Sequence, residues 1–493
     1  MVIVAFQTEL RPELPEINGS KDYREFRATL EDMDRILVKS GIEHRFISKH
    51  IEKLGLKPNT GKYQFHCRTS RMALRYCILL ALTNESYREL SRHVADSILF
   101  QWFTHTAALG KVKPVSKSSI ERFEKMFESE EIADLIHDLN LVMSDESKAK
   151  ELLYRDTALK FDEIFADTTC VKANIHFPVD WVLLRDGVRT LISAIIVIRK
   201  HGLKHRISAP QQFTKEMNKL CMEMTQVRKK AGAKKSRKKT LRKMKRLVKV
   251  IEKHAETYYR ELESHWQDTD LSELEAQVIL DRIRNILDQL PRAVEQAHER
   301  IIGERRVANK DKIISLYDPD VRVIVRGKSG AEVEFGNSLY LAEQADGLFV
   351  DWKAIKEQPP ADSSLCQPSI ERINEIYGDI ASYTGDRGFD SADNREYLEE
   401  HGISNALCPR SVRLMQEKLD DKEFCSYQKR RAGTEARIGI LKNVYIGYPF
   451  RSKGFANRQI RIEWAVLTHN LWKLASMAAQ KRLEDEEASR LAA

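Results

Sequence analysis

The spacing of apolar residues changes just after residue 310, and this change constrains the fold more than any other feature of the chain. Between 203 and about 310 the apolar residues recur at steps of three and four, as at Ile279, Ile283 and Ile286, which predicts long amphipathic helices. Later segments such as VRVIVRG, residues 321–327, alternate with the period of two that strands have. We therefore expect a domain built on a sheet, into which a long antiparallel helical hairpin is inserted.

The order of the expected elements brings acidic residues to particular strand and helix positions. Strands are expected at KFDEIFAD (160–167), DKIISLYD (311–318), VRVIVRG (321–327), EVEFGNSLYLAEQ (332–344), LFVDWKAI (348–355), DIASYTGD (379–386) and ISNALCPR (403–410). Helices are expected at 368–377, in SADNREYLEEHG up to Gly402, around Glu435, and from Arg461 to Met477. In this order, one strand ends on Asp167, a later one ends on Asp386, and a helix carries Glu435.

A chain of 493 residues is long enough for two to four domains. We expect a lead-in over 1–60, a helical domain over 61–150, a mixed domain formed by 151–202 and 311–480, an inserted basic helical arm over 203–310, and a polar tail over 481–493. The helical domain, with three short helices and tight turns, resembles a helix-turn-helix module that binds DNA, although any small helical bundle with a basic surface has the same pattern. The arginines expected on its surface are Arg68, Arg71, Arg75, Arg88 and Arg92.

Positive charge is concentrated in the expected helical arm. The whole chain has 82 Lys and Arg against 73 Asp and Glu, a net charge of +9, but no acidic residue lies between Glu223 and Glu252. Such a run binds a polyanion by releasing condensed counterions, so nucleic acid is the expected partner. A solvated basic helix or a disordered tether is the alternative interpretation. The candidate DNA contacts on this arm are Lys234, Lys235, Lys238, Lys239 and Arg242.

Several classes of protein are disfavoured by the same sequence. Its seven cysteines include no CxxC pair, which argues for reduced thiols and against a zinc ribbon or a disulfide scaffold. The longest apolar run, LISAIIVI at 191–198, is far shorter than the roughly 20 residues that a membrane span needs. The N-terminus has neither a basic segment nor a cleavage site of the kind found in export signals. We therefore expect a cytoplasmic protein that does not span a membrane.

The segment RRAGTEARIGILKN, residues 430–443, has the most informative pattern of charges. Glu435 follows Arg431 by four residues and precedes Lys442 by seven, so a helix would place a carboxylate between two cations on one face. That pattern suits a metal ion beside a phosphate, but taken alone it is more often a salt-bridged, solvated surface.

Four segments together resemble the DDE transposases of bacterial insertion sequences, in a branch whose first Asp is followed by Thr-Thr and Asn-Ile-His. They are ADTTCVKANIHFPVDWVLLRDGVRTL (166–191), TGDRGFDSADN (384–394), RAGTEARIGILKN (431–443) and EWAVLTHNLWKLA (463–475). The resemblance covers roughly residues 65 to 475. It implies an α+β fold with an RNase H-like core: a central mixed sheet with flanking helices, an N-terminal helical DNA-binding domain, and the helical hairpin inserted after the first core strand.

The resemblance also implies a mechanism and a set of site residues. Asp167, Asp386 and Glu435 would be the catalytic triad and would hold two Mg²⁺ or Mn²⁺ ions, which stabilise the attacking and leaving oxygens of phosphodiester cleavage. Arg387, Arg431 and Lys442 would contact DNA phosphates. The implied substrate is double-stranded DNA, namely transposon ends and target, bound by a homodimer near the bacterial nucleoid.

Some assignments stay open at this stage. Strand-end aspartates can be turn or cap residues, Asp162 or Glu163 could replace Asp167 in a shifted register, and Asp390 could belong to the cap of the next helix. The family's Tyr-x2-Arg-x3-Glu-x6-Lys signature is met except at its first position, which is Gln428, while Tyr427 comes one residue too early. The alternative functions are a structure-specific nuclease with the same core and a catalytically inactive DNA-binding derivative.

Overall fold

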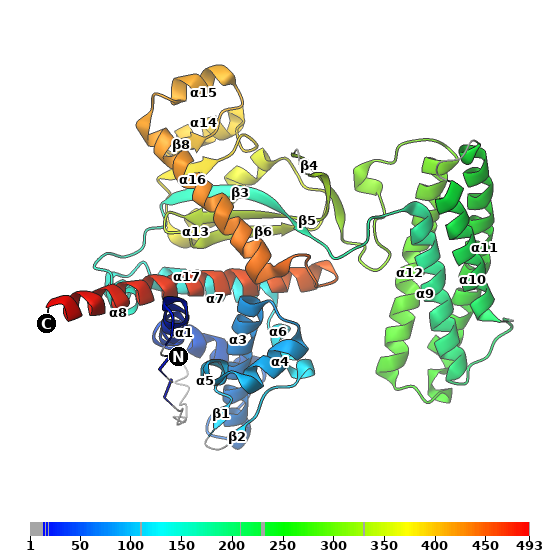
Figure 1. Cartoon of the computed structure of the whole chain (residues 1–493), viewed down its shortest axis with the longest axis horizontal. Helices are drawn as coiled ribbons and strands as arrows, with labels where there is room; N and C mark the ends of the chain where they lie inside the picture. The colour runs from blue at the N-terminus through cyan, green and yellow to red at the C-terminus, as the bar shows by residue number, and fades with distance from the viewer. Residues whose placement is uncertain are drawn as a thin grey trace.

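The computed structural model describes residues 13–14, 16–17, 19–108, 111–207, 209–227, 232–328 and 331–492. Figure 1 shows an N-terminal group of helices, a mixed sheet with helices packed around it, and a helical bundle that stands apart and is joined to the sheet by extended linkers. The fold is therefore mixed α and β, as the change of period predicted, and its sheet is mixed, as the resemblance implied.

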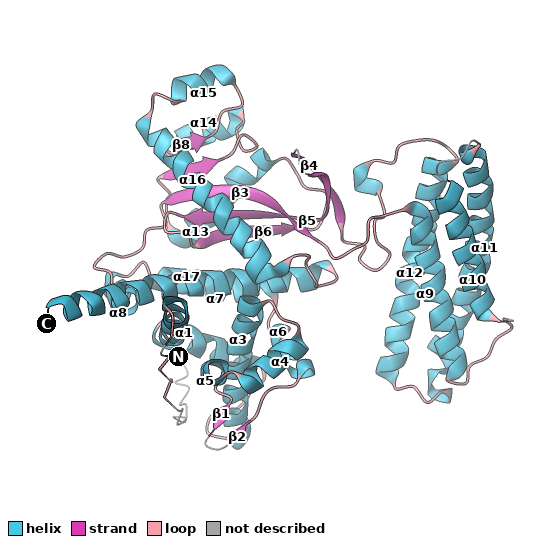
Figure 2. Ribbon diagram, in the orientation of Figure 1, coloured by secondary structure: helices cyan, strands magenta, loops and turns pink. Residues whose placement is uncertain are grey.

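The sheet is built from strands of both orientations, which Figure 2 shows in magenta. Its strands are β3 (Glu163–Lys172), β4 (Arg322–Lys328), β5 (Ala331–Gln344), β6 (Phe349–Ile355), β7 (Ser382–Gly385) and β8 (Ser404–Leu407). The order is β4-β5-β3-β7-β8, and β6 pairs with the remaining length of β5. The first strand is thus central: β3 pairs antiparallel with β5 on one side and parallel with β7 on the other, and β7 pairs parallel with β8.

Four of the five described helices that follow the sheet strands were predicted, and the short helix at Val412–Lys418 was not. The five helices are α13 (Cys366–Tyr377), α14 (Ala392–Glu400), α15 (Val412–Lys418), α16 (Lys422–Ile440) and α17 (Phe455–Ala492), with a short 3-10 turn at Asp362–Leu365 and a π-helical segment at Leu441–Gly447. Ser391 caps α14 by accepting a hydrogen bond from the N–H of Asn394, and Gly402 follows this helix with a φ of +66°. The last helix is longer than predicted, because it continues through the segment expected to be a polar tail.

Two predictions about strands were wrong. The first strand does not end on Asp167, because it stays paired with β5 as far as Lys172, so Asp167 is in the middle of β3. Residues 311–318 do not form a strand. Their backbone is bound by side chains of the preceding long helix instead: Gln296 bonds both the N–H and the C=O of Ile313, and Asn285 donates to the carbonyl of Leu316.

The predicted helical hairpin is a bundle of four helices. It consists of α9 (Asp180–Lys200), α10 (Pro210–Gln226), α11 (Ala233–His265) and α12 (Glu273–Ile301), which share a hydrophobic core separate from that of the sheet. The predicted boundary at residue 203 was therefore too late, since α9 already belongs to the bundle and the run LISAIIVI lies in its core. Gly187 lets α9 approach α12 closely, because a Cβ there would lie 2.7 Å from a methyl group of Leu290.

The N-terminal helices begin earlier than predicted. They are α1 (Lys21–Lys39), α2 (Ile42–Lys53), α3 (Gly61–Thr83), α4 (Tyr87–Asp96), α5 (Ile98–Thr104), α6 (Lys117–Glu124), α7 (Ser129–Val142) and α8 (Glu146–Leu153), with a two-residue hairpin of β1 (Ala107–Ala108) and β2 (Lys111–Val112). The segment 1–60 is not merely a lead-in, because α1 and α2 share a buried core with α3 and α17. Of the arginines expected on this surface, Arg75 is fully buried between Asp34 and Glu43, and Arg71 also pairs with Glu43.

Helix α17 joins the N-terminal helices to the sheet, and Figure 1 shows it running between them. The side chain of Asn470 bonds both the N–H and the C=O of Phe349 at the start of β6. Glu463, on the same helix, accepts from Ser129 of α7 and from the indole of Trp352 in β6. The segment EWAVLTHN thus packs the helical domain and the sheet into one hydrophobic core.

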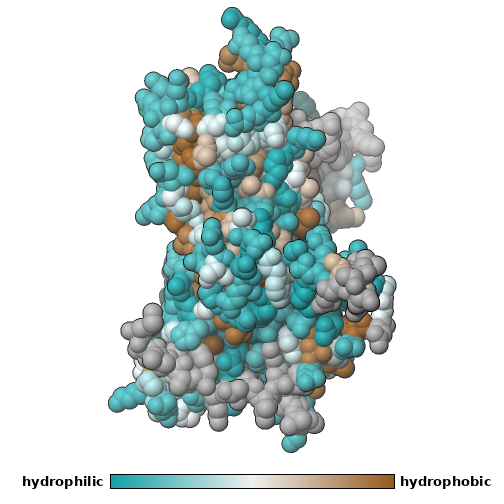
Figure 3. Space-filling model, turned by 90° about the vertical axis from the view of Figure 1, so that its left-hand side faces the viewer, coloured by the Kyte–Doolittle hydropathy of each residue, from teal (hydrophilic) through white to brown (hydrophobic). Residues whose placement is uncertain are grey.

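None of the described helices combines the length and the apolar character that a bilayer span requires. The face of the molecule in Figure 3 is mostly hydrophilic, with apolar residues in scattered small groups.

Candidate active site

The pairing of the two central parallel strands aligns Asp167 with Asp386. In the register of β3 and β7, Phe165 is the partner of Thr384. Asp167 and Asp386 each come two residues later. They therefore lie at the same level, Asp167 in β3 and Asp386 directly after β7. Glu163 lies opposite Ser382, at the other end of β7, so the structure contradicts the shifted register in which Asp162 or Glu163 replaces Asp167.

The electrostatic surroundings of Asp167 show which charges share its site. Burial, the negative charge of Asp386 and, to a smaller extent, that of Glu435 together raise the pKa of Asp167 to about 6. The N–H of Thr168, 2.7 Å from Oδ1, and the guanidinium of Arg431 act in the opposite direction. Three carboxylates and one arginine that are distant in sequence are therefore close enough to influence one another.

A tight turn after β7 orients Asp386. Its Oδ1 accepts a hydrogen bond of 2.7 Å from the N–H of Gly388. The guanidinium of Arg410 donates to the carbonyls of Arg387 and Gly388, both at 2.8 Å, so the turn is held from the end of β8. The side chain of Arg387 is exposed, as a phosphate contact requires.

The neighbouring acid, Asp390, has a different role from Asp386. It is buried and accepts from Arg395 and from the backbone N–H of Arg410. Ser391, not Asp390, provides the cap of α14. Asp390 is thus committed to holding this turn.

A fourth acid, Asp362, lies beside this turn and was missed in the sequence. A Cβ placed on Gly388 would lie 2.6 Å from Oδ2 of Asp362 and 2.9 Å from Oδ1 of Asp386, so the two carboxylates flank this glycine. Asp362 begins the 3-10 turn before α13, and no motif in the sequence distinguishes it from other loop acids.

Helix α16 carries Glu435 beside the strand ends. Glu435 pairs with Arg431 at 2.9 Å, and its side chain is 58% exposed. Arg431 in turn bonds Oε1 of Gln428, whose amide nitrogen donates to the carbonyls of Gly385 in β7 and Ala406 in β8. Gln428, which departs from the family signature, therefore links the helix to both parallel strands and orients Arg431. Tyr427 lies apart from this chain of bonds and donates to Glu423.

A second stripe on α16 anchors the helix to the sheet. Arg430, Thr434 and Arg437 follow one another at steps of four and three, and the first two each come one residue before Arg431 and Glu435 of the predicted motif. All three bond the carboxylate of Glu343, which is fully buried at the end of β5. These bonds and the two positive charges hold the pKa of Glu343 below its usual value, although burial opposes them. The spacing was visible in the sequence, but the partner was not.

Lys442 also reaches the site, although it is in the π-helical segment and not on the regular face of α16. Its Nζ lies 2.9 Å from Oγ1 of Thr169. Thr169 is two residues after Asp167 on the same strand and therefore on the same face of the sheet.

Magnesium or manganese would fit the donor chemistry of this site only in part. Asp167 and Asp386 offer hard carboxylate oxygens at level positions, and their mutual repulsion is what a cation would relieve. Glu435, however, is paired with Arg431. Over the described ranges, no three His, Cys, Asp or Glu side chains form a group arranged to hold a metal ion. The first two acids therefore suit a cation as they stand, and Glu435 would have to leave Arg431 to join them.

The basic residues predicted on the arm lie near the start of α11. Lys234 and Lys238 both pair with Glu304, at 3.2 and 2.8 Å. Lys235, Lys239 and Arg242 are exposed. Residues 228–231, which begin the basic run, lie outside the described residues.

No protein-family model, no curated protein and no solved structure matches this chain.

Proposed function

We propose that the protein is a DNA transposase with an RNase H-like catalytic core. The observation that carries the proposal is the level placement of Asp167 in β3 and of Asp386 directly after the parallel strand β7, with Glu435 within electrostatic range. The strand arrangement supports the same core, because β3 is central, pairs antiparallel with β5, and is followed on its other side by parallel β7 and β8. The competing acid Asp390 is committed to Arg395 and to the N–H of Arg410.

The reaction proposed is cleavage beside the 3′ ends of the element, followed by joining of each 3′-hydroxyl to target DNA. Asp167 and Asp386, joined by Glu435, would hold two Mg²⁺ or Mn²⁺ ions, which when bound stabilise the attacking and leaving oxygens of the displacement. Arg431 has two functions in this proposal: it neutralises Glu435 before DNA binds, and it contacts a phosphate afterwards. Lys442, oriented by Thr169, and the exposed Arg387 would contact neighbouring phosphates.

The proposed assembly, DNA contacts and location of the enzyme follow from this reaction. Two transposon ends need two active sites, so a homodimer is the proposed assembly on DNA. The exposed Arg68, Arg88 and Arg92 of the N-terminal helices suit contacts with the terminal repeats. The proposed location is the bacterial cytoplasm, at the nucleoid.

The test is a cleavage assay on the DNA that flanks the gene, with and without MgCl₂. Asp167→Ala, Asp386→Ala and Glu435→Ala should each abolish cleavage and leave end binding within about threefold of the wild type, a range that corresponds to less than 1 kcal/mol. Asp379→Ala, at an exposed position before β7, is the matched control and should cleave normally. Binding that is lost together with cleavage would mean that the acids have a structural role.

Pre-cut ends distinguish the proposed transposase from its alternatives. A transposase joins such ends to a supercoiled plasmid, whereas a structure-specific nuclease cuts DNA without joining it. A protein that binds the ends and does neither in Mg²⁺ or Mn²⁺ is the inactive derivative, and that result would overturn the proposal.

A further inference from the structure

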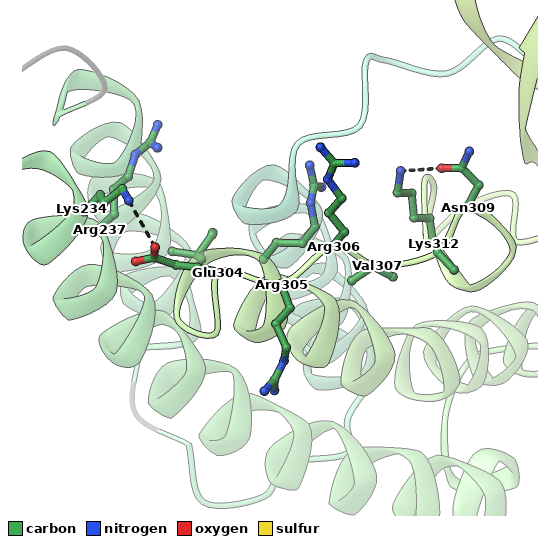
Figure 4. Close-up of a pocket in the computed structure, with 11 residues that line it drawn as sticks. Lys234, Arg237, Glu304, Arg305, Arg306, Val307, Asn309 and Lys312 are labelled. Atoms are coloured by element: carbon green, nitrogen blue, oxygen red, sulfur yellow. Dashed lines mark hydrogen bonds and ion pairs between the residues drawn. The ribbon is translucent and has the colours of Figure 1, made fainter.

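A basic recess lies where the helical bundle meets the linker to the sheet. It has a volume of about 950 Å³ and lies between the start of α11, the end of α12 and the linker that leads to β4. Figure 4 shows Lys234 and Lys312 toward opposite ends of this recess. Its cationic lining residues are Lys234, Arg237, Arg300, Arg305, Arg306 and Lys312.

The positive charge of the recess is only partly neutralised. Glu304, the acid among the described lining residues, already binds both Lys234 and Lys238. Arg300 pairs with Asp180 at 2.8 Å, and Arg305 pairs with Glu299 at 2.5 Å. Neither acid lines the recess. Figure 4 shows Arg305 and Arg306 pointing in opposite directions, so the acid that binds Arg305 does not serve Arg306. Within the described ranges, Arg237, Arg306 and Lys312 pair with no carboxylate.

Two of these three cations lie in surroundings that an anion would improve. The guanidinium of Arg237 stacks 5.3 Å from the ring centre of Trp181, and its buried Nε has no hydrogen-bond partner. Leaving such a buried donor unpaired costs free energy. Lys312 donates to the amide oxygen of Asn309 at 2.6 Å, and burial together with the charge of Arg300 lowers its pKa, although the charge of Asp180 opposes them. A negative group here would satisfy a donor and reduce the repulsion between like charges.

We propose that this recess binds backbone phosphates of DNA that crosses the junction between the bundle and the sheet. The inference rests on the proposed function and adds DNA contacts such as Arg306 and Lys312 to the predicted arm residues. Six of the eleven lining residues are lysines or arginines, a charge that favours an anionic ligand. The cations are spread from Lys234 to Lys312, which suits a row of phosphates better than one small anion. Arginine also matches the geometry of a phosphate by donating two parallel hydrogen bonds.

The test compares salt dependences of DNA binding for the full-length protein. The probe is a labelled 30-base-pair duplex of arbitrary sequence, with binding followed by fluorescence anisotropy at several KCl concentrations. Each neutralised phosphate contributes about 0.9 to the slope of log K against log salt. The double variant Arg306→Gln/Lys312→Gln should therefore lower the magnitude of the slope by about 1 to 2. Neither side chain pairs with an acid, so the folded structure should be retained, which circular dichroism checks.

The matched control is Arg260→Gln/Arg282→Gln, which removes two exposed charges toward the other end of the same bundle. Its slope should stay within experimental error of the wild type. An equal reduction in both double variants, or none in Arg306→Gln/Lys312→Gln, would overturn the inference while leaving the transposase proposal intact. Absence of DNA binding by the wild type would refute the proposed function itself.

Inorganic phosphate is the probe in the last part of the test. If calorimetry detects phosphate binding that Arg306→Gln/Lys312→Gln abolishes, and the DNA slope does not change, the recess is a site for a free phosphate and the inference is wrong.

Discussion

Asp167→Asn should stabilise the protein at neutral pH, although it removes a residue proposed to be catalytic. The native environment raises the pKa of Asp167 from 3.8 to about 6, because the carboxylate is buried beside Asp386. Between these two values the native state binds more protons than the unfolded state, so stability falls as pH rises, and the penalty is complete above about pH 6. An amide has no charge to bury, and its oxygen can still accept from the N–H of Thr168.

The magnitude follows from the size of the pKa difference. About two pKa units, at about 1.4 kcal/mol each, correspond to about 3 kcal/mol. Because solvent reaches part of the Asp167 side chain, we expect Asp167→Asn to raise the free energy of unfolding by about 2 kcal/mol at pH 8. At pH 4 the carboxyl group is mostly protonated in the native state, so the variant and the wild type should differ little.

Urea denaturation followed by tryptophan fluorescence, at pH 4 and pH 8, measures this difference. Trp352 and Trp464 report on the core that contains the sheet. Asp379→Asn, which removes an exposed carboxylate before the neighbouring strand β7, is the control and should change stability by less than about 0.5 kcal/mol at either pH. If Asp167→Asn were as stable as the wild type at pH 8, or less stable, the acids would not repel one another and the reasoning about the site would fail.

Two further substitutions test how the site is held. Glu343→Gln removes the charge that two arginines of α16 share, and should cost about 3 kcal/mol in urea denaturation; the surface variant Asp346→Asn should cost less than about 1 kcal/mol, and equal losses would contradict the anchoring role. Gly388→Ala places a Cβ 2.9 Å from Oδ1 of Asp386 and so should reduce cleavage at least tenfold. DNA binding by Gly388→Ala should not change, and full cleavage activity would show that the turn tolerates displacement.

Local helices and strands were predicted more accurately than the contacts between them. Strands β5 and β6 and helices α13 and α14 follow from local periodicity and end signals, and they were predicted to within a few residues. The prediction of a strand at 311–318 was wrong because the backbone there bonds to Gln296 and Asn285. These side chains lie on α12, and the alternating pattern of residues 311–318 gives no sign of them. The hairpin became a bundle because α9, which precedes the recognised long helices, buries its apolar face against them.

The residues of the candidate site also divide into those that the sequence predicted and those that only the structure brought out. The sequence predicted Asp167, Asp386, Glu435, Arg387, Arg431 and Lys442 as site residues, because a joint pattern of motifs and spacing marks them, and their role stays a prediction. Gln428 was noted only as a departure from the signature, and its bonds to β7 and β8 were not foreseen. Glu343 and Asp362 carried no signal, because their partners come from other elements.

By itself, the sequence determined most of the helical and extended segments, which segments are basic, and which acids lie in the recurring motifs. These properties depend on side-chain period, capping residues and charge, all of which act over a few residues. The tertiary structure decided that Asp167 is level with Asp386, that Gln428 and Glu343 hold α16 against the sheet, and that the bundle and its linker enclose a basic recess. Those features depend on strand register and long-range packing, which join residues that no local pattern connects.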